Sequence, residues 1–251
     1  MKLLVAALHG IMNGGTAPTW PVAFERFMLN RDPEVHVVTR HYFELPFPRI
    51  NWIKNRWLAR QLTNELALLL GKPETTGQGG SAPGLWFVGH SNGTVIAWLT
   101  AKALIARGYT IGGMILTGAA LEAHFDKNRI TEWVCSGHLG RAVAYSSKDD
   151  AVVAGDAHCV KPLVWKLRDF IWGAAMWPYG CLGRSGWQSY NGDWVDVPEI
   201  YTRWFAGGHS CYFREGQSEQ TFDLMYQDMG GKEQGAKGEG QGTRGTEGKG
   251  A

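Results

Sequence analysis

Ser91 lies between two glycines, at a point where one sequence pattern changes into another. A short apolar run at 85–88 precedes it, and apolar side chains then recur with helical spacing as far as about residue 107. Gly89 and Gly93 leave the room that a sharp turn between a strand and a helix requires. At the start of such a helix, unpaired N–H groups and the helix dipole favour negative charge. The pattern predicts a nucleophilic serine on a strand–turn–helix corner, with a structural glycine-rich turn as the alternative.

A serine hydroxyl is a poor nucleophile at neutral pH, so it needs a base, and the base needs a carboxylate to orient it. The polar loop 147–155 offers Asp149 and Asp150 directly after an expected strand. We favour Asp150 as the acid, because the apolar residues after it would pack the loop against the body of the protein. The alternative is a solvated acidic turn in which Asp150 caps the following helix.

The expected base lies in the loop 206–210, which follows the last expected strand. The glycines Gly207 and Gly208 would let the backbone bring His209 towards Ser91. His90 adjoins the nucleophile, but we expect its side chain to point away from the serine's side of the tight turn. No pair of histidines has metal-ligand spacing beside a carboxylate, so we expect no metal and no cofactor.

The tetrahedral intermediate of acyl transfer carries an oxyanion, which needs N–H donors. We expect one donor to be the backbone of Asn92, directly after the nucleophile. The second would come from the loop after the first strand, where Gly10 permits a close approach and the N–H of Ile11 is best placed. The alternative is that His9 and Gly10 merely turn the chain.

These residues resemble the motifs of α/β-hydrolase-fold serine hydrolases, of the compact kind seen in small lipases and esterases. The matching segments lie between about residues 2 and 229: His9-Gly10-Ile11 (oxyanion loop), Gly89-His90-Ser91-Asn92-Gly93 (elbow), Asp150-Ala151-Val152-Val153 (acid loop) and Gly207-Gly208-His209 (base loop). The resemblance implies a Ser91–Asp150–His209 triad, with the order nucleophile, acid, base along the chain.

Alternating strand and helix patterns predict the architecture that must position these residues. The expected strands are 2–8, 35–39, 85–88, 111–116, 141–146 and 200–205, and the expected helices 21–29, 52–70, 91–107, 157–172 and 218–229. Such alternation favours a mostly parallel sheet of about six strands with helices on both faces, a three-layer α/β sandwich. We expect one α/β-hydrolase domain over 1–229.

Two stretches depart from this periodicity. Residues 173–198 contain many aromatic side chains among glycines, and they would either line an apolar pocket or pack on the outside of the domain. From residue 230 to 251 there is no large apolar residue, which predicts a disordered tail of glycine and charged residues.

Composition limits the classes of partner that the protein is expected to bind. The formal net charge is +2 with mixed signs, and this argues against nucleic acid. Four cysteines lie far apart, as expected for free thiols in a reducing compartment. No apolar run approaches the roughly 20 residues that span a bilayer. We therefore expect a cytoplasmic protein. The motifs and the aromatic stretch favour a small, apolar ester or acyl compound as its partner. The sequence does not indicate the oligomeric state.

The leading functional hypothesis is hydrolysis of a carboxylic ester through an acyl-enzyme on Ser91. A thioesterase or acyltransferase would use the same triad. A binding protein that kept the fold without catalysis is the alternative from another class.

Overall fold

Six parallel strands form one sheet within the part of the chain that the computed structural model describes, in the order β2-β1-β3-β4-β5-β6. The described residues are 3–10, 20–40, 48–73, 84–125, 129–153, 180–188 and 197–231. The strands are β1 (Leu3–Leu8), β2 (Val35–Arg40), β3 (Gly84–His90), β4 (Gly113–Thr117), β5 (Ala142–Ser146) and β6 (Ile200–Trp204). The helices are α1 (Trp20–Arg31), α2 (Pro48–Leu70), α3 (Asn92–Ile105), α4 (Ile130–Cys135), α7 (Leu182–Ser185), the 3₁₀ helix η2 (Cys211–Phe213) and α8 (Ser218–Asp228).

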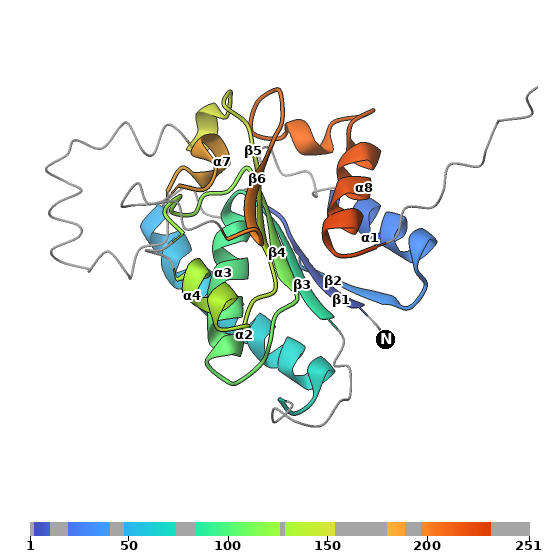
Figure 1. Cartoon of the computed structure of the whole chain (residues 1–251), viewed down its shortest axis with the longest axis vertical. Coiled ribbons are helices and arrows are strands. Elements are labelled where there is room, and N and C mark those ends of the chain that lie inside the picture. Colours follow the sequence, from blue (N-terminus) through green and yellow to red (C-terminus); the bar gives the residue numbers. More distant parts are fainter. Residues whose placement is uncertain are drawn as a thin grey trace, which may run out of the picture.

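The central strands are apolar on both faces, and alternate residues enter two separate cores. In β1, Leu4, Ala6 and Leu8 belong to one core, while Val5 and Ala7 belong to the other. A strand buried on both sides must be covered by helices on both sides. Figure 1 shows this arrangement, with α2, α3 and α4 on one face of the sheet and α1 and α8 on the other. The predicted three-layer, parallel α/β architecture is confirmed.

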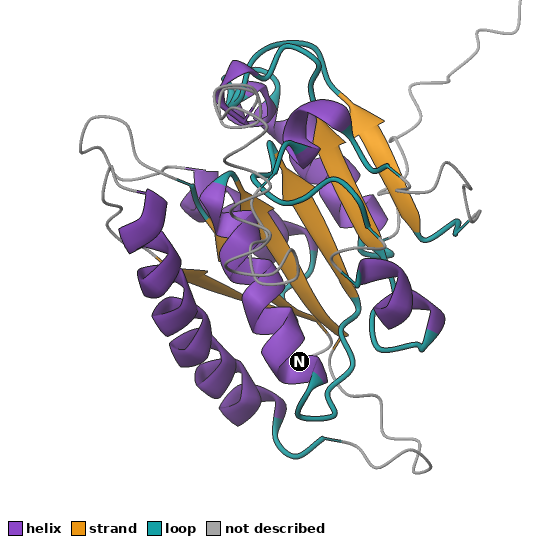
Figure 2. Ribbon diagram, turned by 90° about the vertical axis from the view of Figure 1, so that its left-hand side faces the viewer, coloured by secondary structure: helices purple, strands orange, loops and turns teal. Residues whose placement is uncertain are grey.

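The parallel strands all run in one direction, so their carboxyl ends meet along one edge of the sheet (Figure 2). The loops after β1, β3, β5 and β6 leave from this edge, and the sequence places the candidate residues on these loops. The fold therefore gathers segments that are more than a hundred residues apart in the chain.

Several predicted boundaries shift. The helix predicted from residue 52 begins at Pro48, and α3 ends at Ile105 rather than near 107. The strand predicted from Ile111 begins at Gly113, which pairs with Trp86. A Cβ on Gly113 would lie 2.3 Å from the Trp86 ring, so a glycine is required there.

A second polar cluster, the Asp228 cluster, ties the end of α8 to the sheet. It consists of Asp228, Tyr145, Tyr201 and Arg203. The hydroxyls of Tyr145 and Tyr201 each donate to the Asp228 carboxylate at 2.7 Å. Arg203 donates through Nε at 2.9 Å and through a second guanidinium nitrogen at 2.5 Å. Burial, with the adjacent carboxylate second, raises the pKa of the Tyr145 hydroxyl, so it remains a donor at ordinary pH.

Several of the remaining predicted segments lie wholly or partly outside the described residues. The helix predicted at 157–172 and most of the predicted tail, from residue 232, lie outside the described residues. Of the aromatic stretch 173–198, the described Trp187 is buried in the core against Phe125, whereas the other aromatic residues of that stretch fall outside the description.

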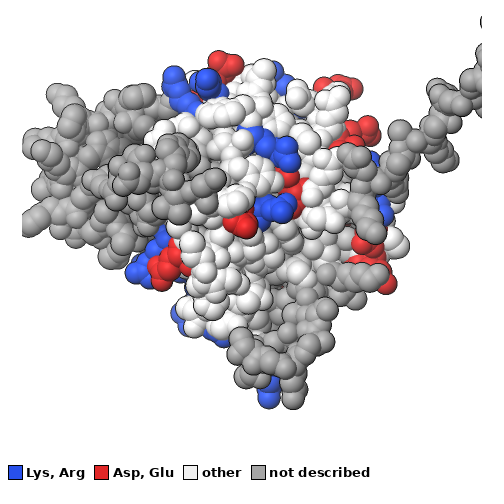
Figure 3. All heavy atoms as spheres, viewed as in Figure 1, with Lys and Arg blue, Asp and Glu red and all other residues white. Residues whose placement is uncertain are grey.

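The charge distribution, the helices and the cysteines of the described residues relate to the expected partners. Figure 3 shows basic and acidic side chains interspersed on one face, without a continuous basic stripe there. None of the described helices is both long and apolar enough to cross a membrane. The described cysteines, Cys135, Cys181 and Cys211, carry free thiols.

Candidate active site

Ser91 occupies the corner between β3 and α3 with a strained backbone. Its φ is 53° and its ψ is −125°, in a region that residues with a side chain rarely adopt. Hydrogen bonds on both sides hold this geometry. The Ser91 N–H donates to Thr117 O at 3.0 Å, and the Ser91 carbonyl accepts from the N–H of Thr94 at 3.1 Å and from its hydroxyl at 2.6 Å. The local strain presents Ser91 at the carboxyl edge of the sheet, as the motif predicts.

The glycines around Ser91 are required by close contacts. A Cβ on Gly93 would lie 2.3 Å from Leu8 O, so α3 starts directly against the end of β1. A Cβ on Gly10 would lie 2.4 Å from Ser91 Cβ and 3.1 Å from Ser91 Oγ. The loop after β1 therefore approaches the serine hydroxyl with its bare backbone. The expected second oxyanion donor, Ile11, is the next residue and lies outside the described residues.

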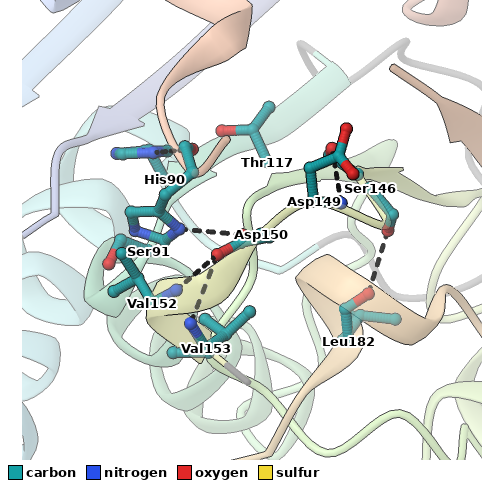
Figure 4. A network of polar contacts seen from close by, with 12 residues as sticks. His90, Ser91, Thr117, Ser146, Asp149, Asp150, Val152, Val153 and Leu182 are labelled. Atoms are coloured by element: carbon teal, nitrogen blue, oxygen red, sulfur yellow. Dashed lines mark hydrogen bonds and ion pairs between the residues drawn. The ribbon is translucent and has the colours of Figure 1, made fainter. Parts of the chain in front are cut away.

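Asp150 is completely buried and has two sets of partners. Its Oδ2 accepts a hydrogen bond from Nδ1 of His209 at 2.8 Å. Its Oδ1 accepts from the amides of Val152 at 3.1 Å and Val153 at 3.3 Å (Figure 4). The two interpretations of Asp150, as a cap for the following turn and as the partner of the base, thus describe the same carboxylate. The backbone contacts fix one oxygen and leave the other for the imidazole.

Asp149, the alternative acid, is placed differently. It is exposed, and its carboxylate accepts only from the N–H of Gly207 at 3.3 Å among the described contacts. This contact ties the acid loop to the base loop, which is also held by a hydrogen bond from the Ser147 hydroxyl to Gly207 O. Asp149 therefore helps to join the two loops, while Asp150 reaches the imidazole.

His209 lies in the loop after β6, with 13% of its side chain exposed. Because the carboxylate of Asp150 accepts, Nδ1 carries the proton, and Nε2 of a neutral ring is left to accept one. Gly118, at the end of β4, lies against the ring, since a Cβ there would be 3.1 Å from Nδ1. Within the described residues no hydrogen bond joins Ser91 Oγ to His209. Such contacts are often longer in the free enzyme and close when substrate binds.

His90, the last residue of β3, lies beside His209. Its ring packs against that of His209, with the centroids 4.8 Å apart, and its Nε2 lies 3.1 Å from the His209 carbonyl oxygen. Burial, with the neighbouring His209 second, lowers the pKa of His90 to about 4. His90 is thus a neutral group that packs against His209. The expectation that its side chain points away from Ser91 stays a prediction, and the contact with His209 is a feature that the sequence did not indicate.

Asn92, the expected first oxyanion donor, is buried and its side chain is paired with Asn55 of α2. Asn55 Nδ2 donates to Asn92 Oδ1 at 2.8 Å, and Asn92 Nδ2 donates back to Asn55 Oδ1 at 3.1 Å. Asn55 belongs to none of the motifs in the sequence. A signal was present, since Asn55 shares the helical spacing of the buried residues Ala59, Leu62 and Leu66. A polar residue on the buried face of a helix needs a partner.

No group of histidine, cysteine and acidic residues among the described residues could hold a metal ion. The arrangement instead offers a serine, a histidine that donates from Nδ1 to a carboxylate, and the buried carboxylate itself. These are the groups that nucleophilic acyl transfer needs.

Comparisons with known proteins bear on the fold of the chain. No family model matches it, and neither does any curated protein sequence. An uncharacterized protein from Bacillus cereus ATCC 10987 is similar in structure, with a TM-score of 0.50 and 12% identity over 90% of this chain. This chain spans 59% of the length of that protein.

Further similar structures are enzymes. The NocB thioesterase domain from the nocardicin cluster has a TM-score of 0.48 and 13% identity, covering 92% of this chain and 95% of the domain. A predicted CIB-like hydrolase from Thermoplasma acidophilum has a TM-score of 0.45 and 12% identity, covering 90% of this chain and 87% of its own. The strand order, the parallel sheet and the serine corner after β3 define the class: the chain has the α/β-hydrolase fold.

Proposed function

We propose that this protein is a serine hydrolase that cleaves a carboxylic ester through an acyl-enzyme on Ser91. One observation carries the proposal. The buried Asp150 and the partly buried His209, joined at 2.8 Å, lie at the same sheet edge as a serine held in the strained geometry of a nucleophile corner. Structural strain and a buried carboxylate both reduce stability, so their presence together favours a catalytic role.

In the proposed mechanism, Ser91 Oγ attacks the carbonyl carbon of the ester while Nε2 of His209 takes the hydroxyl proton. The carbonyl π electrons move to oxygen, and the N–H groups of Asn92 and Ile11 donate to the resulting oxyanion. When the intermediate collapses, the C–O bond to the alcohol breaks and His209 returns the proton to the leaving oxygen. Asp150 orients the ring and stabilises its charged form.

Water then attacks the acyl-enzyme by the same route. His209 removes a proton from the water as it attacks and returns it to Ser91 Oγ when the acid leaves. A thioester would pass through the same steps with a thiol as the leaving group. In acyl transfer, another alcohol or an amine would replace the water. The apolar character expected of the acyl group rests on the sequence alone.

The experiment that tests this proposal is intact-mass spectrometry after treatment with a fluorophosphonate. Such a reagent labels a serine that is activated by a base and an oxyanion site. We expect one adduct on the wild-type chain and none on Ser91→Ala, with Ser136→Ala as a control that retains the adduct. Ser91→Ala should also abolish ester hydrolysis while its melting temperature stays nearly unchanged.

A matched pair of oxyester and thioester substrates with the same acyl chain would then measure the preference between the two reactions. Labelling that persists in Ser91→Ala would remove this residue from the role of nucleophile. A folded wild-type protein without either adduct or turnover would favour the non-catalytic binding protein.

A further inference from the structure

We infer that His90 is a positioning residue, which holds the main chain of the base loop so that the ring of His209 faces the nucleophile. The inference rests on the proposed function and deepens it. It gives a role in the site to a residue that adjoins Ser91 in sequence and contacts His209 in space.

The contact itself defines the protonation of His90. A carbonyl oxygen can only accept, so the bond of 3.1 Å to His209 O requires a proton on Nε2 of His90. Because burial keeps the pKa of His90 near 4, the ring is neutral at ordinary pH. His90 therefore donates to the base loop without adding a positive charge that would oppose protonation of His209.

The two ends of this contact differ in how firmly they are held. His90 ends β3, a central strand, and pairs with Thr117 of β4 in the sheet. His209 lies in the loop after β6, which is an edge strand. The hydrogen bond therefore connects a loop, which is generally more mobile than a strand, to a central strand of the sheet. Because β4 and β5 lie between β3 and β6 in the sheet, this contact joins two segments that strand pairing does not connect.

The base is thereby held at two points. Asp150 binds the ring of His209 at Nδ1, and His90 binds its carbonyl oxygen. The bonds of Ser147 and Asp149 hold Gly207, two residues before His209, whereas the bond from His90 reaches the main chain of His209 itself. Fixing the main chain as well determines where Nε2 lies relative to Ser91. Small displacements of a catalytic group have large effects on rate, since about 1 Å can reduce it 100-fold.

The surroundings of His90 make a clean substitution possible. Its ring contacts Phe213 edge-on at 5.3 Å and Tyr212 at 6.4 Å between centroids, and the side chain is buried. Phenylalanine keeps an aromatic ring in this aromatic surrounding but cannot donate. Glutamine has an amide nitrogen at about the same distance from the backbone as Nε2, so it restores a donor. His36→Phe, at an exposed histidine of β2, is the matched control.

We expect His90→Phe to lower kcat by about 10- to 100-fold with little change in KM, because substrate binding is intact while the base is misplaced. His90→Gln should recover much of the lost rate, and His36→Phe should match the wild type.

Hydrogen exchange of residues 205–213 gives a readout that does not depend on activity. The donor holds the loop, so this segment should exchange faster in His90→Phe than in the wild type or His36→Phe, at equal melting temperature. Unchanged exchange, or a kcat within twofold of wild type, would overturn the role of His90. A loss of rate that follows the melting temperature and is not rescued by glutamine would do the same. An inactive wild type would count against the proposed function, while the exchange measurement would still decide the role of His90.

Discussion

Two buried carboxylates, Asp150 and Asp228, show two ways in which this protein accommodates a charge away from water. Both are nearly inaccessible, at 0% and 2% exposure. Asp228 receives two tyrosine hydroxyls and a two-point contact from Arg203, whose charge is permanent. Asp150 receives two backbone amides and one histidine ring, which becomes charged only when it takes a proton.

Under the proposed function, the difference separates a structural anchor from a group that takes part in catalysis. The Asp228 cluster is electrostatically complete in the resting protein, so it can only hold α8 against β5 and β6. The charge of Asp150 lacks a full counter-charge until His209 becomes protonated, which is the event that the proposed reaction requires. A buried charge whose partner is titratable thus stabilises a reaction step rather than the resting fold.

The largest effect that would test this comparison is on catalysis. Asp150→Asn should reduce kcat by about 10⁴-fold while the protein stays folded, because an amide at this position favours the wrong histidine tautomer. Asp149→Asn is the matched control and should have a much smaller effect, since Asp149 contacts only the loop backbone. Steady-state ester hydrolysis measures both variants. The reverse order would move the role of the acid to Asp149.

The second effect is on stability and belongs to the other carboxylate. Asp228→Ala should lower the free energy of unfolding by about 3 kcal/mol, because it leaves two tyrosine hydroxyls and Arg203 without their acceptor. Activity of the folded fraction should be nearly unchanged.

Asp223→Ala on the same helix is the control for that variant. It breaks a partly exposed ion pair with Arg31, which is worth less than about 1 kcal/mol. Urea unfolding of both variants checks the prediction. Equal destabilisation by the two variants would show that the Asp228 cluster is no special anchor.

The third effect, which is confined to acidic pH, is the response of stability to acid. The pKa of His90 is about 4 in the folded chain, against 6.5 as the ordinary value. Between these pH values the unfolded chain binds a proton at this residue that the folded chain does not. The contribution is complete above about pH 6.5 and falls by roughly 3 kcal/mol as the pH drops to 4.

Urea unfolding of wild type, His90→Phe and His36→Phe between pH 7 and pH 4 measures this contribution. His90→Phe should lose stability less steeply than the wild type as the pH falls, and His36→Phe should follow the wild type. If the wild type and His90→Phe had the same pH dependence, the burial of a neutral histidine beside the base would not be the source of acid sensitivity.

Local patterns were enough to predict much of the fold and the corner at Ser91. Apolar alternation and helical spacing extend over many consecutive residues, and a strand–turn–helix corner is specified by neighbours such as Gly89 and Gly93. Element boundaries were less accurate because they depend on contacts, as Gly113 shows with the ring of Trp86. The donor role expected of Ile11 remains a prediction, since that residue lies outside the described part.

The sequence by itself determined the periodic elements and the chemically capable residues, Ser91, Asp150 and His209. Only the tertiary structure decided that Asp150 rather than Asp149 meets the histidine, that His90 holds the base loop, and that Asn55 pairs with Asn92. The tertiary structure also revealed the Asp228 cluster, which no sequence motif indicates. The physical reason is that the periodicity of a strand or a helix depends on residues that are close together in the sequence. A hydrogen bond between distant loops depends on where the sheet brings their ends together.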